Sequence, residues 1–234
     1  MKELIFCDPG TLDYKKAWDF QAVIHAKRVK NEISDFLFLL EHPNTYTLGK
    51  IAKKEHLTGS EEFLAEKGIS VYEIDRGGDI TYHGPGQLVG YPIISLSDWV
   101  QDAHKYLRAL EEVIILTCNY FSLEAGRNEK HTGVWIGEEK IAAIGIKISR
   151  WITMHGFAFN VNTDLSLFNG IVPCGISDKG VTSLNKVLKV NSVDMDLVKK
   201  VLIENFVRMF HYDSAKEVKL EMFINNSEKE SSHV

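Results

Sequence analysis

Apolar residues recur at intervals of three or four in several stretches of the chain, which is the spacing of an amphipathic helix. This pattern predicts helices over residues 11–31, 98–121 and 193–210. A shorter helix is predicted over residues 60–67, with Ser60 as its N-cap. The predicted buried face of the longest helix consists of Val100, Ala103, Leu107, Leu110, Val113, Ile114 and Thr117.

Short apolar runs between these stretches predict strands. They lie at residues 4–7, 36–40, 69–74, 88–94, 133–137, 140–148 and 154–161. Several of these strands follow one another without an intervening helix, so a regular alternation of strand and helix is excluded. The order predicts an α+β fold, with a mixed or antiparallel sheet and flanking helices packed on one side of it.

Composition narrows the class of protein. The 234 residues are 44% hydrophobic and 25% charged, which fits one soluble globular domain. A net charge of −5 argues against nucleic acid as a partner. No apolar stretch is long enough for a membrane span, and no secretory signal opens the chain. Three cysteines without a paired spacing indicate a reducing, cytoplasmic setting, and no histidine motif indicates a metal site.

Glycine and polar residues gather in the segment from Arg76 to Gln87, which the sequence predicts to be rich in turns. Its four glycines let the backbone run close to another molecule, and its arginine, threonine, tyrosine and histidine offer polar contacts. A tight hairpin with incidental polar residues is the alternative. The segment is not a dinucleotide-binding fingerprint, because Val89 stands where a third glycine is required.

Three cysteines are candidates for thiol chemistry. Cys174 lies between Pro173 and Gly175, a setting with little bulk that suits an accessible nucleophile. The alternative is a buried and inert cysteine, the commoner state of a free thiol. Cys7 ends an apolar strand and Cys118 lies on the apolar face of a helix, so both are interpreted as structural.

Two strands carry a polar residue at or near their start. Lys140 opens the run to residue 148; if it faces inward, desolvation lowers its pKa and allows it to act as a base or to pair with a thiolate. The alternative is a lysine at a strand edge that extends into water. His155 lies near the start of the 154–161 run, which could line an acyl-chain slot or form a core strand with a hydrogen-bonded histidine.

Taken together, these segments resemble the octanoyltransferase family, also called lipoate-protein ligase B. The resemblance rests on Arg-Gly-Gly-x-x-Thr-Tyr-His-x-x-Gly-Gln-x-x-x-Tyr at residues 76–91 and on further motifs in the family's order. These are residues 41–49, 132–136, 140–145, 155–158 and 173–175. The match covers residues 36–185, and it implies the fold of the biotin/lipoate ligase catalytic domain.

The resemblance also implies a set of site residues. Cys174 and Lys140 would be the catalytic pair, and His155 would orient the site. The substrate-binding positions would be Arg76, Gly77, Gly78, Asp79, Ile80, Thr81, Tyr82, His83, Ala143, Ile144, Gly145, Gly156, Phe157 and Ala158. We expect no cofactor, a single catalytic domain over residues 1–224, and a frayed polar tail over 225–234.

The implied reaction moves an octanoyl group from octanoyl-acyl carrier protein to a lysine of a lipoyl domain, in dehydrogenase E2 subunits or glycine cleavage H protein. An octanoyl thioester on Cys174 would be the intermediate. One alternative with the same fold is an ATP-dependent lipoate or biotin ligase, which activates a free acid and needs no cysteine. Another is a non-catalytic module that binds such proteins through Lys50, Lys53 and Lys54.

Overall fold

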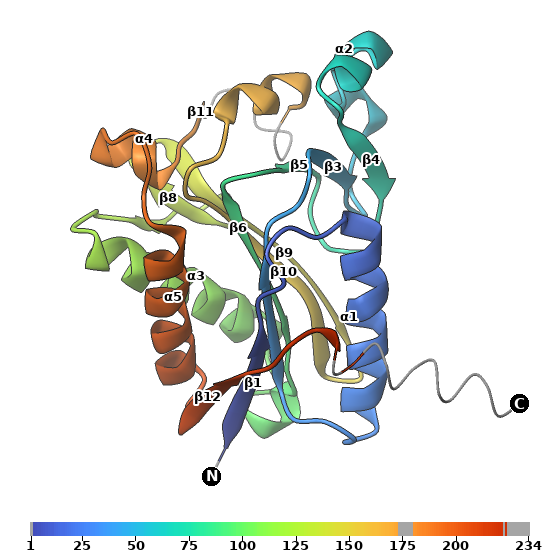
Figure 1. Ribbon diagram of the computed structural model, residues 1–234, viewed down its shortest axis with the longest axis vertical. Helices are drawn as coiled ribbons and strands as arrows, with labels where there is room; N and C mark the ends of the chain where they lie inside the picture. The colour runs from blue at the N-terminus through green and yellow to red at the C-terminus, as the bar shows by residue number, and fades with distance from the viewer. Residues whose placement is uncertain (1, 173–179, 222, 224–234) are drawn as a thin grey trace, which may run out of the picture.

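The computed structural model describes residues 2–172, 180–221 and 223 (Figure 1). Within this part of the chain, nine strands form one mixed sheet in the order β12-β1-β2-β6-β10-β9-β8-β7, with β11 paired to β9. The strands are β1 (Glu3–Cys7), β2 (Phe36–Leu40), β6 (Gln87–Ile93), β7 (Gly126–Arg127), β8 (Val134–Ile136), β9 (Glu139–Ser149), β10 (Ile152–Asn160), β11 (Gly180–Val181) and β12 (Ser214–Glu217). The predicted α+β class with a mixed sheet is confirmed.

Helices cover both faces of this sheet, so the expectation that they lie on one side is wrong. Helix α1 (Tyr14–Val29) packs on one face, and α3 (Ala103–Tyr120) and α5 (Met195–Met209) pack on the other (Figure 1). Strands β2 and β10 are buried along their whole length because of this two-sided cover. Their continuous apolar runs are typical of strands buried on both faces.

Helix α3 begins later than its apolar pattern suggests. Asp102 is the N-cap, and its side chain accepts hydrogen bonds from the backbone N–H groups of His104 and Lys105, at 2.9 and 3.0 Å. Residues 98–102 therefore precede the helix, and Val100 and Ala103 do not belong to its buried face. Leu110, Val113, Ile114 and Thr117 are buried as predicted, whereas Leu107 is half-buried. The capping carboxylate fixes the start of this helix more strongly than the hydrophobic period does.

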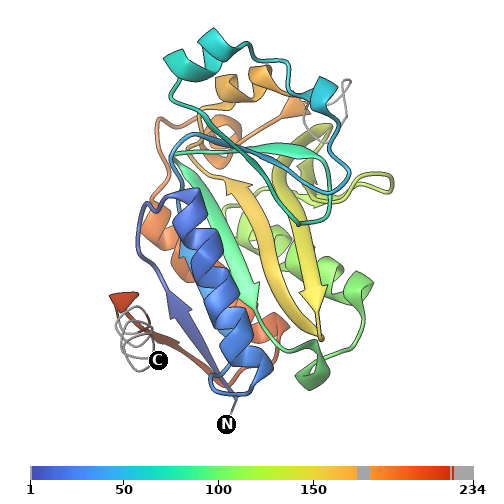
Figure 2. The same cartoon turned by 90° about the vertical axis from the view of Figure 1, so that its right-hand side faces the viewer.

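A second sheet of three strands lies across one end of the main sheet (Figure 2). It consists of β3 (Thr45–Leu48), β4 (Ser70–Glu73) and β5 (Ile80–His83), with the short helix α2 (Glu61–Glu66) preceding β4. Ser60 caps α2 as predicted, accepting from the backbone N–H of Phe63 at 3.2 Å. Strand β5 lies inside the segment that was expected to consist of turns, and all four of its residues are buried.

The remaining short elements connect these layers. They are the 3-10 helices η1 (Lys54–His56), η2 (Leu96–Asp98) and η3 (Leu165–Gly170) and the α-helix α4 (Leu184–Leu188), and they lie between the strands. Within the described residues, no helix is both long and apolar enough to cross a membrane. The expected tail, residues 225–234, lies outside the described residues.

Asp35 joins three parts of the structure and should contribute strongly to stability. Its buried carboxylate accepts from Arg28 Nε at 2.9 Å, from the backbone N–H of Ser95 at 2.8 Å and from the Tyr212 hydroxyl at 2.8 Å. We expect Asp35→Ala to lower the free energy of unfolding by about 3–5 kcal/mol, because it leaves a buried guanidinium without this partner.

The matched control is Asp19→Ala. Asp19 pairs with Lys15 on the surface of α1, where both side chains are more than half exposed. Its loss should cost less than about 0.5 kcal/mol. Urea unfolding measures both variants, and equal losses would contradict the role assigned to Asp35.

Candidate functional site

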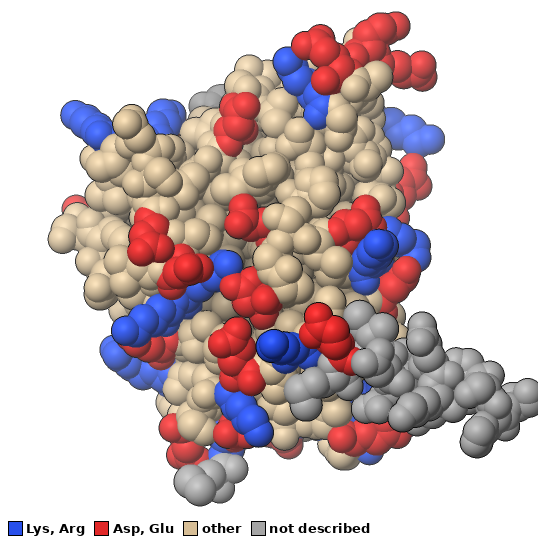
Figure 3. All heavy atoms as spheres, viewed as in Figure 1, with Lys and Arg blue, Asp and Glu red and all other residues tan. Residues whose placement is uncertain are grey.

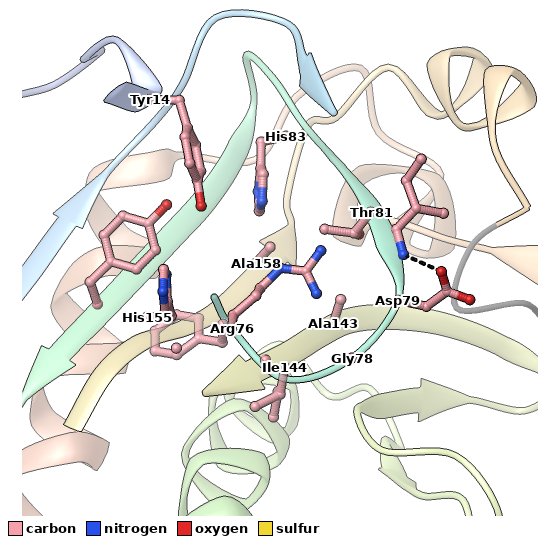
Figure 4. A pocket seen from close by; sticks show the side chains of 15 residues that line it. Tyr14, Arg76, Gly78, Asp79, Thr81, His83, Ala143, Ile144, His155 and Ala158 are labelled. Atoms are coloured by element: carbon pink, nitrogen blue, oxygen red, sulfur yellow. Dashed lines mark hydrogen bonds between the residues drawn. The ribbon is translucent and has the colours of Figure 1, made fainter. Parts of the chain in front are cut away.

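A pocket lies where the second sheet meets β9 and β10 (Figure 4). Its cavity volume is about 50 Å³, or about 460 Å³ with the open mouth included. All the predicted substrate-binding residues line it except Gly77 and Tyr82. The Gly77 N–H donates to the carbonyl of Ile146 at 2.9 Å, and the Tyr82 hydroxyl donates to Asn44 at 2.9 Å. The structure thus brings the predicted segment around residues 76–83 onto the β9–β10 hairpin, which lies far from it in the sequence.

Glycines allow the loop after β4 to lie directly on β9. A Cβ atom at Gly145 would lie 2.7 Å from the carbonyl oxygen of Gly77 and 2.9 Å from Cδ of Arg76. A Cβ atom at Gly156 would lie 2.2 Å from the carbonyl oxygen of Gly90. Neither position has room for a side chain, which is the physical reason for glycine there.

Arg76 places a guanidinium in the middle of the pocket (Figure 4). Its Nη2 donates to the backbone carbonyl of Thr47 at 2.7 Å and to Thr47 Oγ1 at 3.0 Å, and its Nη1 donates to the carbonyl of Gly77 at 3.0 Å. These contacts fix a positive charge between β3 and the loop of residues 76–79, called the Gly-rich loop below. The loop is also held by Asp79, which lies 2.6 Å from Nδ1 of His56.

A chain of buried hydrogen bonds runs from Arg76 to β10. Thr47 Oγ1 accepts from Arg76, so its own proton can be donated to Nε2 of His83 at 3.3 Å. The other ring nitrogen of His83 then donates to Gln87 Oε1 at 2.9 Å, and Gln87 Nε2 donates to Asn160 Oδ1 at 2.9 Å. Both ring nitrogens of His83 and both ends of the Gln87 amide have a partner in this chain, which fixes the pocket wall.

Lys140 is buried at the start of β9, with a relative exposure of 7%, so the interpretation as an edge lysine in water is wrong. Its Nζ lies 4.9 Å from the centroid of the Trp135 ring, and its carbonyl accepts from the N–H of Thr182 at 3.0 Å. A smaller hollow beside Lys140 shares Thr81, Ala143 and Ala158 with the main pocket. The lysine therefore lies at one end of a slot that continues into that pocket.

The predicted nucleophile, Cys174, lies outside the described residues. The chain on both sides of it is attached next to the pocket. The N–H of Val172 donates to the carbonyl of His56 at 2.8 Å, and Gly180 and Val181 pair with Glu139 and Lys140. Cys7 and Cys118 are buried as expected, and burial raises the pKa of each thiol to about 12, which makes both poor nucleophiles.

Two tyrosines line the pocket that sequence reasoning did not single out. Tyr14, at the start of α1, stacks on the His83 ring with a centroid separation of 5.7 Å. The Tyr91 hydroxyl lies 2.7 Å from Nε2 of His42. Tyr91 ends the Gly-rich motif and could have been noticed there, whereas nothing in the sequence around Tyr14 indicates that α1 reaches the site.

Buried histidines should make the fold sensitive to acid. Burial lowers the pKa of His42 and of His155 to about 4, and it lowers that of His83 well below its ordinary value. In the unfolded chain, His42 and His155 bind a proton below a pH of about 6.5. In the folded chain they do not bind one until about pH 4. Stability is therefore complete above pH 6.5 and falls as the pH drops through this window.

We expect each of His42 and His155 to remove about 2 kcal/mol of stability between pH 7 and pH 5. Urea unfolding at the two pH values measures this loss. His42→Gln should reduce the loss, whereas a matched variant of an exposed histidine, His104→Gln, should keep it in full. Equal stability of the unaltered protein at both pH values would contradict the assignment of neutral, buried rings.

Known proteins share both the sequence and the fold. Residues 13–207 match the family described as the lipoyl protein ligase A/B catalytic domain. An octanoyltransferase of Flavobacterium johnsoniae is 48% identical over 225 residues, covering 89% of this chain and 97% of that protein. The biotin/lipoate ligase fold expected from the motifs is also confirmed.

Two solved structures carry that fold at low sequence identity. A bi-partite lipoate protein ligase from Thermoplasma acidophilum superposes with a TM-score of 0.74 at 18% identity, covering 97% of this chain and 92% of that one. Lipoate-protein ligase A bound with ATP gives 0.72 at 16% identity, covering 96% and 92%. Such low identity establishes the fold alone, and the closer sequence relationship decides the family. The chain belongs to the octanoyltransferase family of the lipoyl protein ligase A/B group.

Proposed function

We propose that this protein transfers an octanoyl group from acyl carrier protein to a lysine of a lipoyl domain, by way of a thioester on Cys174. The observation that carries the proposal is the slot that begins at buried Lys140 and continues between β9, β10 and the Gly-rich loop. Membership of the octanoyltransferase family supports this reaction.

The first half-reaction is an exchange of thioesters. The Cys174 thiolate attacks the carbonyl carbon of the octanoyl thioester on the carrier protein, and a carbon–sulfur bond forms to Cys174. The carbon–sulfur bond to the carrier breaks, and the departing thiolate takes up the proton that Lys140 received from Cys174. One thioester replaces another, so no ATP is needed to drive this step.

In the second half-reaction the acceptor lysine attacks the Cys174 thioester as a free amine. An amide bond forms, the bond to Cys174 breaks, and Lys140 takes the proton that the amine loses. The Trp135 ring face, 4.9 Å from Nζ, stabilises the ammonium that Lys140 becomes. Burial of Lys140 keeps competing water away from this proton exchange.

Chain connectivity supports the position of Cys174. Only Pro173 separates it from Val172 in the sequence. Val172 is hydrogen-bonded to His56, and His56 contacts Asp79 of the Gly-rich loop. The chain that leads to Cys174 therefore starts beside the Gly-rich loop, which supports a role for this residue at the slot.

The proposed partners are octanoyl-acyl carrier protein as donor and the lipoyl domains of E2 subunits and glycine cleavage H protein as acceptors. A cytoplasmic setting stays a prediction. The ATP-dependent ligase remains the rival to be tested, because it shares the fold.

The test supplies a lipoyl domain with octanoyl-acyl carrier protein without ATP, and in parallel with free octanoate or lipoate plus ATP. We expect octanoylated lipoyl domain in the first mixture and none in the second, read by mass spectrometry. Modification only in the second mixture would establish a ligase instead. Binding without modification in either mixture would establish the non-catalytic module.

A further inference from the structure

His155 lies at the far end of the slot from Lys140. Along β9 and β10 the paired residues are Ala143 with Ala158, Gly145 with Gly156, and Ile146 with His155. Three residues of strand separate the first pair from the last, or about 10 Å. An extended eight-carbon chain spans roughly 9 Å, since it contains seven carbon–carbon bonds of about 1.5 Å in a zigzag. A chain whose carbonyl lies at Ala143 and Ala158, where the hollow beside Lys140 meets the main pocket, therefore ends just before His155.

The backbone at His155 is bent to bring its side chain into the pocket. Strand alternation would place His155 on the same face as Phe157, which packs in the core beneath α3. Instead φ at His155 is +56°, and its ring lies 6.3 Å from the ring of Trp18 in α1, on the opposite face. The side chain of Gln21 accepts the His155 N–H at 2.9 Å and holds this strained conformation.

The imidazole itself is fixed at this end of the slot. Nε2 donates to Oδ1 of Asp75 at 2.8 Å, and Asp75 also accepts from Lys147. The neutral ring therefore carries a lone pair on Nδ1, and this atom has no hydrogen-bond partner among the described residues. His155 is 1% exposed, and the buried side chains of Tyr14 and Tyr91 close the same end of the pocket.

We propose that His155 is a specificity-determining residue that limits the acyl chain to about eight carbons; the inference rests on the function proposed above. An octanoyl chain stops short of the ring. A longer chain reaches the imidazole and must displace it, which breaks the hydrogen bond from Nε2 to Asp75. Loss of the partner of a buried hydrogen-bonding group weakens use of the longer chain by about 5- to 150-fold.

The test compares kcat/KM for octanoyl-, decanoyl- and dodecanoyl-acyl carrier protein. The unaltered protein should use the octanoyl substrate at least about fivefold better than the decanoyl substrate. His155→Met has a flexible side chain of similar volume with no hydrogen bond to Asp75 to lose, so it should raise the ratio of decanoyl to octanoyl activity by about 5- to 150-fold. His155→Gln keeps a polar group of similar reach, and its ratio should stay near that of the unaltered protein.

Two further variants keep the test decisive. His155→Asn is shorter and tolerates a positive φ, so it replaces the Met variant if that one does not fold, and it too should raise the ratio. His25→Met is the matched control, because His25 lies outside the slot and contacts the Ser149 carbonyl at 3.3 Å. An unchanged ratio in a folded Met or Asn variant, or an equal rise in His25→Met, would overturn the inference. Failure of the unaltered protein to transfer octanoyl at all would instead contradict the proposed function.

Discussion

Cys174→Ala is expected to reduce octanoyl transfer by a factor on the order of 10⁴ or more, because it removes the atom that carries the acyl group. The substitution leaves the described slot residues unchanged, so binding of the octanoyl donor should change little. Steady-state transfer to a lipoyl domain measures the first effect, and the affinity for octanoyl-acyl carrier protein measures the second.

The controls for this variant are the two buried cysteines. Cys7→Ala and Cys118→Ala each shorten a buried side chain in the core, so each should lower the melting temperature. Each should keep its turnover at temperatures where the variant remains folded. If Cys174→Ala kept its activity, or if Cys118→Ala lost as much as Cys174→Ala, a covalent intermediate on Cys174 would be excluded.

Lys140→Met is expected to lower kcat by about 10²- to 10⁴-fold with little change in the affinity for the donor. Methionine has a similar shape and packs against Trp135 and the backbone of Gly133, which lie around the lysine stem. It cannot carry a proton between Cys174, the leaving thiol and the incoming amine. Single-turnover measurement of acyl-enzyme formation and of its discharge separates the two half-reactions.

Lys186→Met is the matched control for the lysine. Lys186 pairs with Glu139, next to Lys140 in the sequence, but its side chain is half exposed and lies outside the slot. Its loss should leave kcat within about twofold, as is usual for surface ion pairs. Unchanged turnover in Lys140→Met would remove the proposed base.

Local signals in the sequence identified most elements of the fold. Continuous apolar runs located β2 and β10, and Ser60 located the start of α2, since these features depend on neighbouring residues only. The site motifs were also visible, because the close approach of the loop to β9 demands glycine at fixed positions such as 145.

Long-range packing accounts for what the sequence could not reveal. The side of the sheet on which α1 packs depends on contacts with strands far away in the chain, and only those contacts bring Tyr14 to the pocket. Strand β5 was hidden, because its partner β3 lies more than thirty residues earlier and glycines flank it. The burial of Lys140 beneath Trp135 likewise depends on the pairing of β8 with β9.

In the proposed reaction, Cys174 carries the octanoyl group between the donor and the acceptor. The most direct measurement is mass spectrometry of the intact protein and its peptides after incubation with octanoyl-acyl carrier protein, without an acceptor. We expect one octanoyl adduct, a hydroxylamine-sensitive thioester on the peptide that contains Cys174. This thioester should be absent from Cys174→Ser and should be discharged on addition of a lipoyl domain. An octanoyl thioester that persists on another residue of Cys174→Ser, or transfer that proceeds without any acyl-enzyme, would contradict it.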